Sequence, residues 1–80
     1  MNFVMAAATV FQLVLMPTAG LPGIRTAANA ELFKPFSVQK TFSTENECHA
    51  DFESNAGMYL QQRGLPFGTS ANHSCSAVQQ

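Results

Sequence analysis

The chain has 80 residues, of which 46% are hydrophobic and 11% are charged, and its formal net charge at pH 7 is −1. This length permits one small domain. Four Lys and Arg residues against five Asp and Glu residues provide no basic surface for the phosphates of a nucleic acid, so we expect no nucleic-acid partner.

The first predicted element is the apolar run over residues 3–16, FVMAAATVFQLVLM, which only Thr9 and Gln12 interrupt. A run of this length is typical of the hydrophobic region of a signal peptide, and it is shorter than the roughly 20 residues that a transmembrane helix needs. Pro17 and Gly20 follow the run and would end a helix there. We therefore predict an apolar N-terminal helix, which is either cleaved as a signal peptide or retained.

The predicted cleavage site lies further along, after Ala30 in the small-residue pattern Ala28-Asn29-Ala30. Small side chains at the two alanine positions fit a signal peptidase. The sequence is thus predicted to divide into a signal peptide over residues 1–30 and a small mature domain over residues 31–80. The alternative interpretation of the apolar run is a helix buried in the core of a soluble protein.

The next element is a strand over residues 36–42, where Phe36, Val38 and Phe42 alternate with polar residues. Such alternation is typical of a half-buried strand. Lys40 falls on the apolar side and weakens the pattern, and Pro35 favours an edge or entry position.

A helix over residues 45–63 follows. Thr44-Glu45-Asn46-Glu47 matches a capping box. In this motif the Thr44 side chain accepts a hydrogen bond from the Glu47 amide, and the Glu47 side chain accepts one from the Thr44 amide. Gly64 predicts the C-terminal stop. Residues at three- and four-residue steps define the buried face: Cys48, Phe52, Ala56, Tyr59 and Leu60.

The segment from Leu65 to Ser70 is predicted as a loop, and a short edge strand is predicted over residues 72–78. The aromatic residues of the predicted mature part are assigned to the core. Phe33 and Phe67 lie in Pro-containing loops, where they are the candidates for exposure.

Cys48 and Cys75 are the only cysteines and are predicted to form one disulfide, as two thiols usually do in an oxidising compartment. The helix carries the chain roughly 28 Å, and the residues after it are long enough to return to its start. The predicted fold is thus a small α+β unit, strand–helix–short strand, stapled by this bond. Closing the loop stabilises it by about 3–4 kcal/mol in the chain-entropy model.

The sequence offers two other uses of the cysteines. Cys48 and Cys75 with His49 and His73 contain the ligand types of a zinc site. However, neighbouring residues on a helix diverge by about 100°, which argues against Cys48 and His49 sharing one metal. Thiol catalysis is also disfavoured, because acidic residues surround Cys48 and raise the pKa expected for its thiol. We expect both histidines on the surface, and no metal or cofactor.

The carboxylates Glu47, Asp51 and Glu53 are interpreted as a solvated helix face. Asn72-His73-Ser74 matches an N-glycosylation acceptor, which has meaning only in a eukaryotic secretory pathway. No set of nucleophile, base and oxyanion donor is visible. The sequence therefore favours a secreted or periplasmic protein that is not an enzyme and that binds an unknown protein or small molecule, or takes part in an assembly. The alternative is a membrane-associated modulator that touches the membrane only through an uncleaved N-terminal segment.

Overall fold

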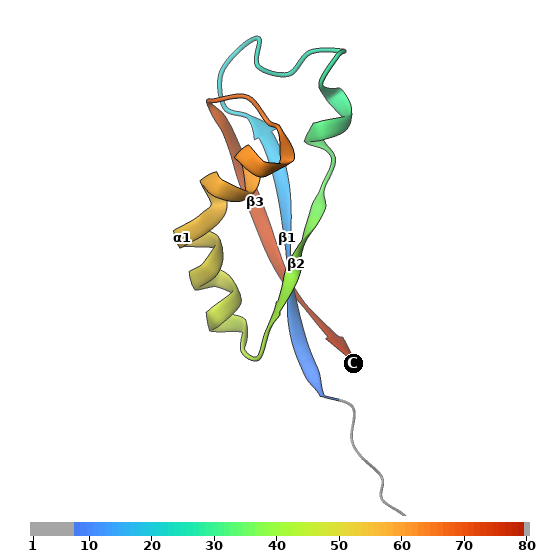
Figure 1. The fold of residues 1–80 in the computed structure, drawn as a ribbon, viewed down its shortest axis with the longest axis vertical. Helices are drawn as coiled ribbons and strands as arrows, with labels where there is room; N and C mark the ends of the chain where they lie inside the picture. Colours follow the sequence, from blue (N-terminus) through green and yellow to red (C-terminus); the bar gives the residue numbers. More distant parts are fainter. Residues whose placement is uncertain (1–7, 80) are drawn as a thin grey trace, which may run out of the picture.

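The structure, a computed structural model, describes residues 8–79. One helix lies beside a three-stranded sheet in a small α+β unit (Figure 1). The antiparallel sheet and the single helix confirm the predicted class in its coarse form. In chain order the elements are β1 (Thr9–Ala19), the 3-10 helix η1 (Ala30–Phe33), β2 (Phe36–Phe42), α1 (Glu45–Arg63) and β3 (Thr69–Gln79).

The sheet has the strand order β2-β1-β3, and β1 runs antiparallel to both of its neighbours. Strands β2 and β3 therefore run in the same direction on either side of β1, and α1 connects them. The helix lies along the strands (Figure 1), and it packs on the face that carries Leu13 and Leu15, which are both fully buried. The core of the unit lies between this helix and this face of the sheet.

The apolar run at the N-terminus departs from the sequence prediction. Residues 9–19 form the central strand β1 instead of a helix, while residues 1–7, where the predicted helix begins, lie outside the described residues. In β1 the residues that face the helix are buried and those between them are half-buried. Such a strand can carry a nearly continuous apolar run, which periodicity does not distinguish from a helix. The β-branched residues Val10 and Val14 favour the strand.

Pro17 fits into this central strand because β1 has two partners over only part of its length. The pairing with β2 ends at Leu15 and Phe36, whereas the pairing with β3 continues through Pro17 and Ala71. On its β2 side, Pro17 therefore faces no strand that would accept a hydrogen bond from a backbone amide, so the amide hydrogen that proline lacks is not needed there. Pro17 thus lies just beyond the end of the pairing between β1 and β2. The sequence had suggested that it ends a helix.

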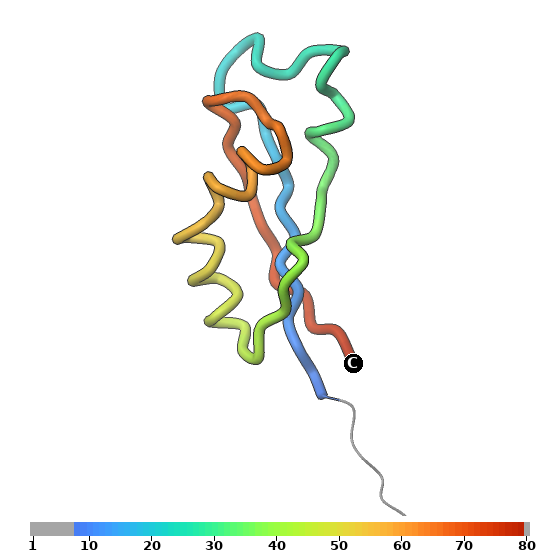
Figure 2. The backbone as a smooth tube through the Cα atoms, viewed as in Figure 1, coloured from blue at the N-terminus to red at the C-terminus, as the bar shows by residue number. Residues whose placement is uncertain are grey.

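The connection from β1 to β2 is a folded loop at the same end of the molecule as the loop after α1 (Figure 2). Within the predicted cleavage pattern, Asn29 accepts a hydrogen bond from the Thr26 amide (2.7 Å) and donates one to the Ile24 carbonyl (2.9 Å). Phe33, which follows in η1, is buried with 6% exposure. The predicted division after Ala30 therefore does not coincide with a boundary of the fold, and cleavage at that position stays a prediction.

Strand β2 has the predicted bounds, and its register explains the irregular position of Lys40. The pairing with β1 shifts between Gln12 and Val14, so β2 bulges over the stretch that contains Lys40. The Lys40 ammonium group lies 3.4 Å from an Asp51 carboxylate oxygen on α1 and 5.3 Å from the centre of the Phe42 ring. The charge on the apolar side of the strand is thus paired with the helix.

Helix α1 also has the predicted bounds. The Thr44 hydroxyl accepts from the Glu47 amide at 3.1 Å, and Gly64 ends the helix with a φ of 90°. The second half of the predicted capping box is different, because the Glu47 carboxylate accepts from the Ser43 hydroxyl at 3.4 Å. Local signals were sufficient here because a helix end is built from residues adjacent in sequence.

Strand β3 is longer than predicted, since it begins at Thr69 and pairs with β1 along its whole length. The loop before it places Phe67 in full exposure, whereas Phe33 is buried. Gly68 has a φ of 94°, and a Cβ atom there would lie 2.8 Å from the Ile24 side chain. The buried hydrophobic core of the described residues comprises Leu13, Leu15, Phe33, Val38, Phe42, Cys48, Leu60 and Leu65.

Candidate functional site

The two cysteines meet where the first turns of α1 pack on β3. Cys48 is fully buried, and its sulfur lies at disulfide-bonding distance from that of Cys75, with 6.1 Å between the two Cα atoms. The predicted pair is therefore brought together across 27 positions of sequence. It fastens the C-terminal edge strand to the helix.

The alternation of β3 turns His73 toward the helix together with Cys75. In the ladder Cys75 lies opposite Leu13 and His73 lies opposite Leu15, and both leucines face α1. Residues two apart in a strand share a face. His73 is consequently half-buried under the helix, and the expectation of a surface histidine is wrong for this residue.

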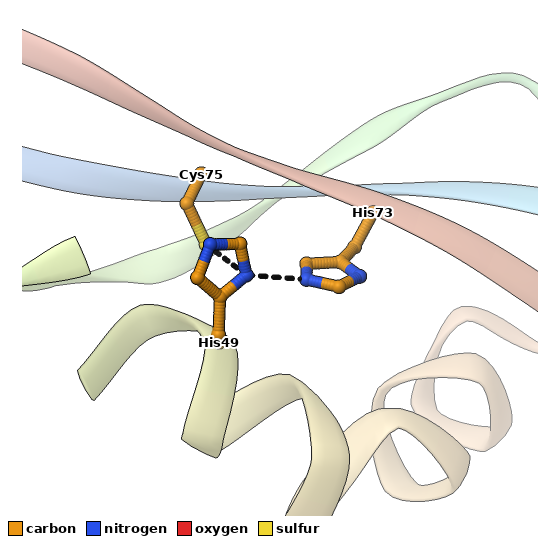
Figure 3. Close-up of side chains that lie close together, drawn as sticks. All are labelled: His49, His73 and Cys75. Carbon is orange, nitrogen blue, oxygen red and sulfur yellow. Dashed lines mark hydrogen bonds between the residues drawn. The ribbon is translucent and has the colours of Figure 1, made fainter. Parts of the chain in front are cut away.

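His49 approaches the same place from the helix, one residue after Cys48. Its Nδ1 atom lies 2.7 Å from Nε2 of His73 and 3.6 Å from the sulfur of Cys75. Figure 3 shows the His49 ring reaching from the helix toward both side chains of the strand. The cluster of His49, His73 and Cys75, which we call the histidine–disulfide cluster, thus joins α1 to β3.

A carboxylate on the helix lies next to one nitrogen of His49. Nε2 of His49 lies 3.4 Å from a Glu45 oxygen, one helical turn away. Because an ionised carboxylate only accepts, Nε2 donates to it, and in the neutral ring Nδ1 keeps its lone pair. Nδ1 then accepts from the Nε2–H of His73.

Aromatic packing fixes the second ring. The Phe52 ring stacks on His73 with 3.9 Å between centroids and 16° between planes, while His49 meets His73 edge-on at 78°. His73 is thereby held between a helix aromatic and a helix histidine. While Cys75 is in the disulfide it has no thiolate, so the histidine pair has no sulfur nucleophile to activate.

A second polar cluster joins α1 to β2. The Asp51 carboxylate accepts from the Tyr59 hydroxyl, from the Asn55 amide at 2.9 Å and from Lys40 at 3.4 Å. The side chain of Asp51 is 9% exposed, so the interpretation of a fully solvated acidic face is wrong for this residue. Burial raises the pKa of Asp51, but the hydrogen bonds from Tyr59 and Asn55 and the charge of Lys40 outweigh it and leave this pKa below its ordinary value.

We expect titration of Tyr59 to report on this cluster. Burial, together with the hydrogen bond to Asp51 and its charge, raises the pKa of Tyr59 from 10.0 to about 12. The unfolded chain therefore loses its phenolic proton first, so the stability that the neutral phenol contributes is present below pH 10.0 and is lost as the pH rises through about 12.

The measurement is direct, since the chain has one Tyr and no Trp. The phenolate absorbance should have its midpoint near pH 12 in the native protein and near 10.0 in denaturant. Asp51→Asn should lower the native midpoint because it removes the charge. Equal midpoints in the native and denatured protein would contradict the burial of this hydroxyl.

The two edges of the sheet differ in how they are protected from pairing with another strand. Strand β2 is short, follows Pro35, bulges and carries Lys40. These are usual devices that prevent edge-to-edge association. Strand β3 spans 11 residues, TSANHSCSAVQ, with no proline and no Asp, Glu, Lys or Arg. Within residues 8–79, β1 is the only strand that pairs with β3.

Comparison of the chain with protein-family models, with curated protein sequences and with solved structures finds no match. Among the described residues, no helix is both long enough and apolar enough to span a membrane.

Sequence reasoning identified the cysteine pair and missed the histidine pair. The alternation that turns Cys75 inward applies equally to His73, and this signal was available in the sequence. The position of His49 was not, because it depends on how α1 rotates against the sheet. The cluster takes one residue from α1 and two from β3.

Proposed function

We propose that this chain is a small exported protein, secreted or periplasmic, that acts without catalysis by associating along the outer edge of β3. The unprotected β3 edge carries this proposal. A strand added to such an edge gains main-chain hydrogen bonds along its length. The export part of the proposal is supported by the cysteine pair at bonding distance, because disulfides persist in oxidising compartments.

The occupant that fits this edge best is a second copy of the chain. Two antiparallel β3 strands would lie opposite one another about a two-fold axis. Like charges directly opposite each other destabilise a strand pair, and β3 has no Asp, Glu, Lys or Arg to create them. A net charge of −1 also gives little repulsion between copies. The result would be a continuous six-stranded sheet with one helix from each copy.

The oligomeric state of the full chain tests this proposal. We expect light scattering to give a concentration-dependent dimer of the 8.6 kDa chain. Ser76 is exposed near the centre of β3, and Ser76→Lys should shift the protein to monomer by placing like charges across the new pair.

Ser37→Lys is the matched control, since it places the same charge at an exposed position of the β2 edge. It should leave the dimer intact. A parent protein that is monomeric at high concentration, or two lysine variants with the same effect, would contradict assembly through β3.

The alternative proposal is a membrane-associated modulator that retains an apolar N-terminal helix. This fold is harder to combine with such a helix. Leu13 and Leu15 are fully buried in the sheet. For residues 9–16 to enter a membrane as a helix, both side chains would have to leave the core, and β3 would lose its partner strand.

A further inference from the structure

The histidine–disulfide cluster presents more ligand atoms than a disulfide requires. Ligand atoms of His49, His73 and Cys75 all lie within 4.8 Å of one another. The sulfur of Cys48 is not in this set, but it lies at bonding distance from that of Cys75 and would be a fourth soft ligand beside it once the bond is reduced. Two cysteines and two histidines are a common ligand set of tetrahedral Zn²⁺.

Two of the separations between ligand atoms can be compared with those of such a centre. With Zn–N of about 2.0–2.1 Å and Zn–S of about 2.3 Å, tetrahedral geometry separates neighbouring ligand atoms by about 3.3–3.8 Å. The separation of 3.6 Å between the Cys75 sulfur and Nδ1 of His49 already fits. The two histidine nitrogens, which are 2.7 Å apart, would open by about 0.6 Å to the zinc separation. Both histidines are half-buried. The two sulfurs, which are at bonding distance in the disulfide, would also separate to about 3.8 Å, and Cys48, which is fully buried, takes part in that movement.

The surroundings also fit a metal centre. Glu45 lies against Nε2 of His49 and so directs the lone pair of Nδ1 toward the cluster. A carboxylate on the remote nitrogen of a ligating histidine is the usual outer partner in zinc sites. Phe52 holds the plane of His73 by stacking on it, with Nε2 of His73 directed at His49.

We propose that reduction of the Cys48–Cys75 bond converts this cluster into a Zn²⁺ site formed by Cys48, His49, His73 and Cys75. An external dithiol supplies two electrons and two protons, which break the S–S bond and give two thiols, and the dithiol itself becomes a disulfide. Zn²⁺ then displaces both thiol protons and binds two thiolates and two neutral imidazoles. The same four residues hold β3 on α1 in both redox states. This inference does not depend on the β3 edge, because His73 and Cys75 face the helix.

Cobalt spectroscopy on the full chain tests the site. The protein is reduced anaerobically with a phosphine, which leaves no competing thiol, and is titrated with Co²⁺. We expect one equivalent to bind with the intense visible bands of tetrahedral cobalt and a thiolate charge-transfer band. Zn²⁺ should displace the cobalt, and the oxidised protein should show neither band.

Variants assign the ligands. His49→Ala and His73→Ala should each abolish the tetrahedral spectrum or weaken Co²⁺ binding at least about tenfold. Glu45→Gln, which removes the outer carboxylate, should weaken it by about 10–100-fold. Glu47→Gln is the matched control, since Glu47 lies in the same turn and bonds to Ser43 instead of His49, and it should have no effect.

Circular dichroism during the titration separates binding from folding. Because metal binding energy is also folding energy in small sites, Zn²⁺ should restore helix content that reduction removes. Absence of tetrahedral bands in the reduced parent overturns the proposal whether or not the chain is folded. Bands that persist unchanged in both histidine variants overturn it as well, since the cysteines alone would then explain them.

Discussion

A chain that begins at Glu31 is expected not to fold, although the sequence pattern predicts that mature N-terminus. Removal of residues 1–30 deletes β1, the central strand with which both β2 and β3 pair. It also removes Leu13 and Leu15, both at 0% exposure, from beneath the helix. Strands β2 and β3 would have no common partner. Since small domains are stable by only about 5–15 kcal/mol, this loss exceeds what the remaining core can offset.

The measurement compares the purified, oxidised segment over residues 31–80 with the full chain by circular dichroism and thermal melting. The full chain should unfold cooperatively, and the segment should give no cooperative transition. Leu13→Ala in the full chain is a milder test of the same core. It should lower the free energy of unfolding by about 2–5 kcal/mol because of the cavity that it leaves.

N-terminal sequencing of the exported protein completes this test. An N-terminus upstream of Thr9 would agree with the fold, in which β1 is required. A cooperative transition in the segment over residues 31–80, together with a native N-terminus at Glu31, would contradict the role of β1 as the central strand of the mature protein.

Loss of the disulfide should have the second large effect. Replacing both Cys48 and Cys75 with Ala removes a link across 27 positions and should lower the free energy of unfolding by about 3–4 kcal/mol in the chain-entropy model. Alanine is preferred to serine at position 48 because the side chain there is fully buried and a hydroxyl would be desolvated. Urea denaturation in metal-free buffer measures the difference.

The reduced parent with a metal chelator is the control for this variant, because it lacks the same bond and keeps both sulfurs. The two should unfold at similar urea concentrations. Mass measurement with and without reductant establishes that the parent is oxidised at the start. Free thiols in the native protein, or equal stability of the parent and the double variant, would mean that packing alone holds β3 on α1.

The sequence by itself determined those elements whose signals are local. Strand β2 and helix α1 have the predicted bounds because alternation, the Thr44 cap and the Gly64 stop each depend on neighbouring residues. The lengths of the helix and of the chain that returns along it permit Cys48 and Cys75 to meet, and their being the only two cysteines predicted the pair.

Only the tertiary structure decided what the apolar run becomes. Residues 9–16 have a pattern that suits a signal helix, a buried helix or a central strand, and the choice depends on whether two other strands are available to pair with it. The length of β3 has the same origin, since its small polar residues have little strand preference and pair only because β1 lies beside them. The meeting of His49 with His73 depends on how α1 lies on the sheet, a geometry set by contacts between elements and not by the residues adjacent to either histidine.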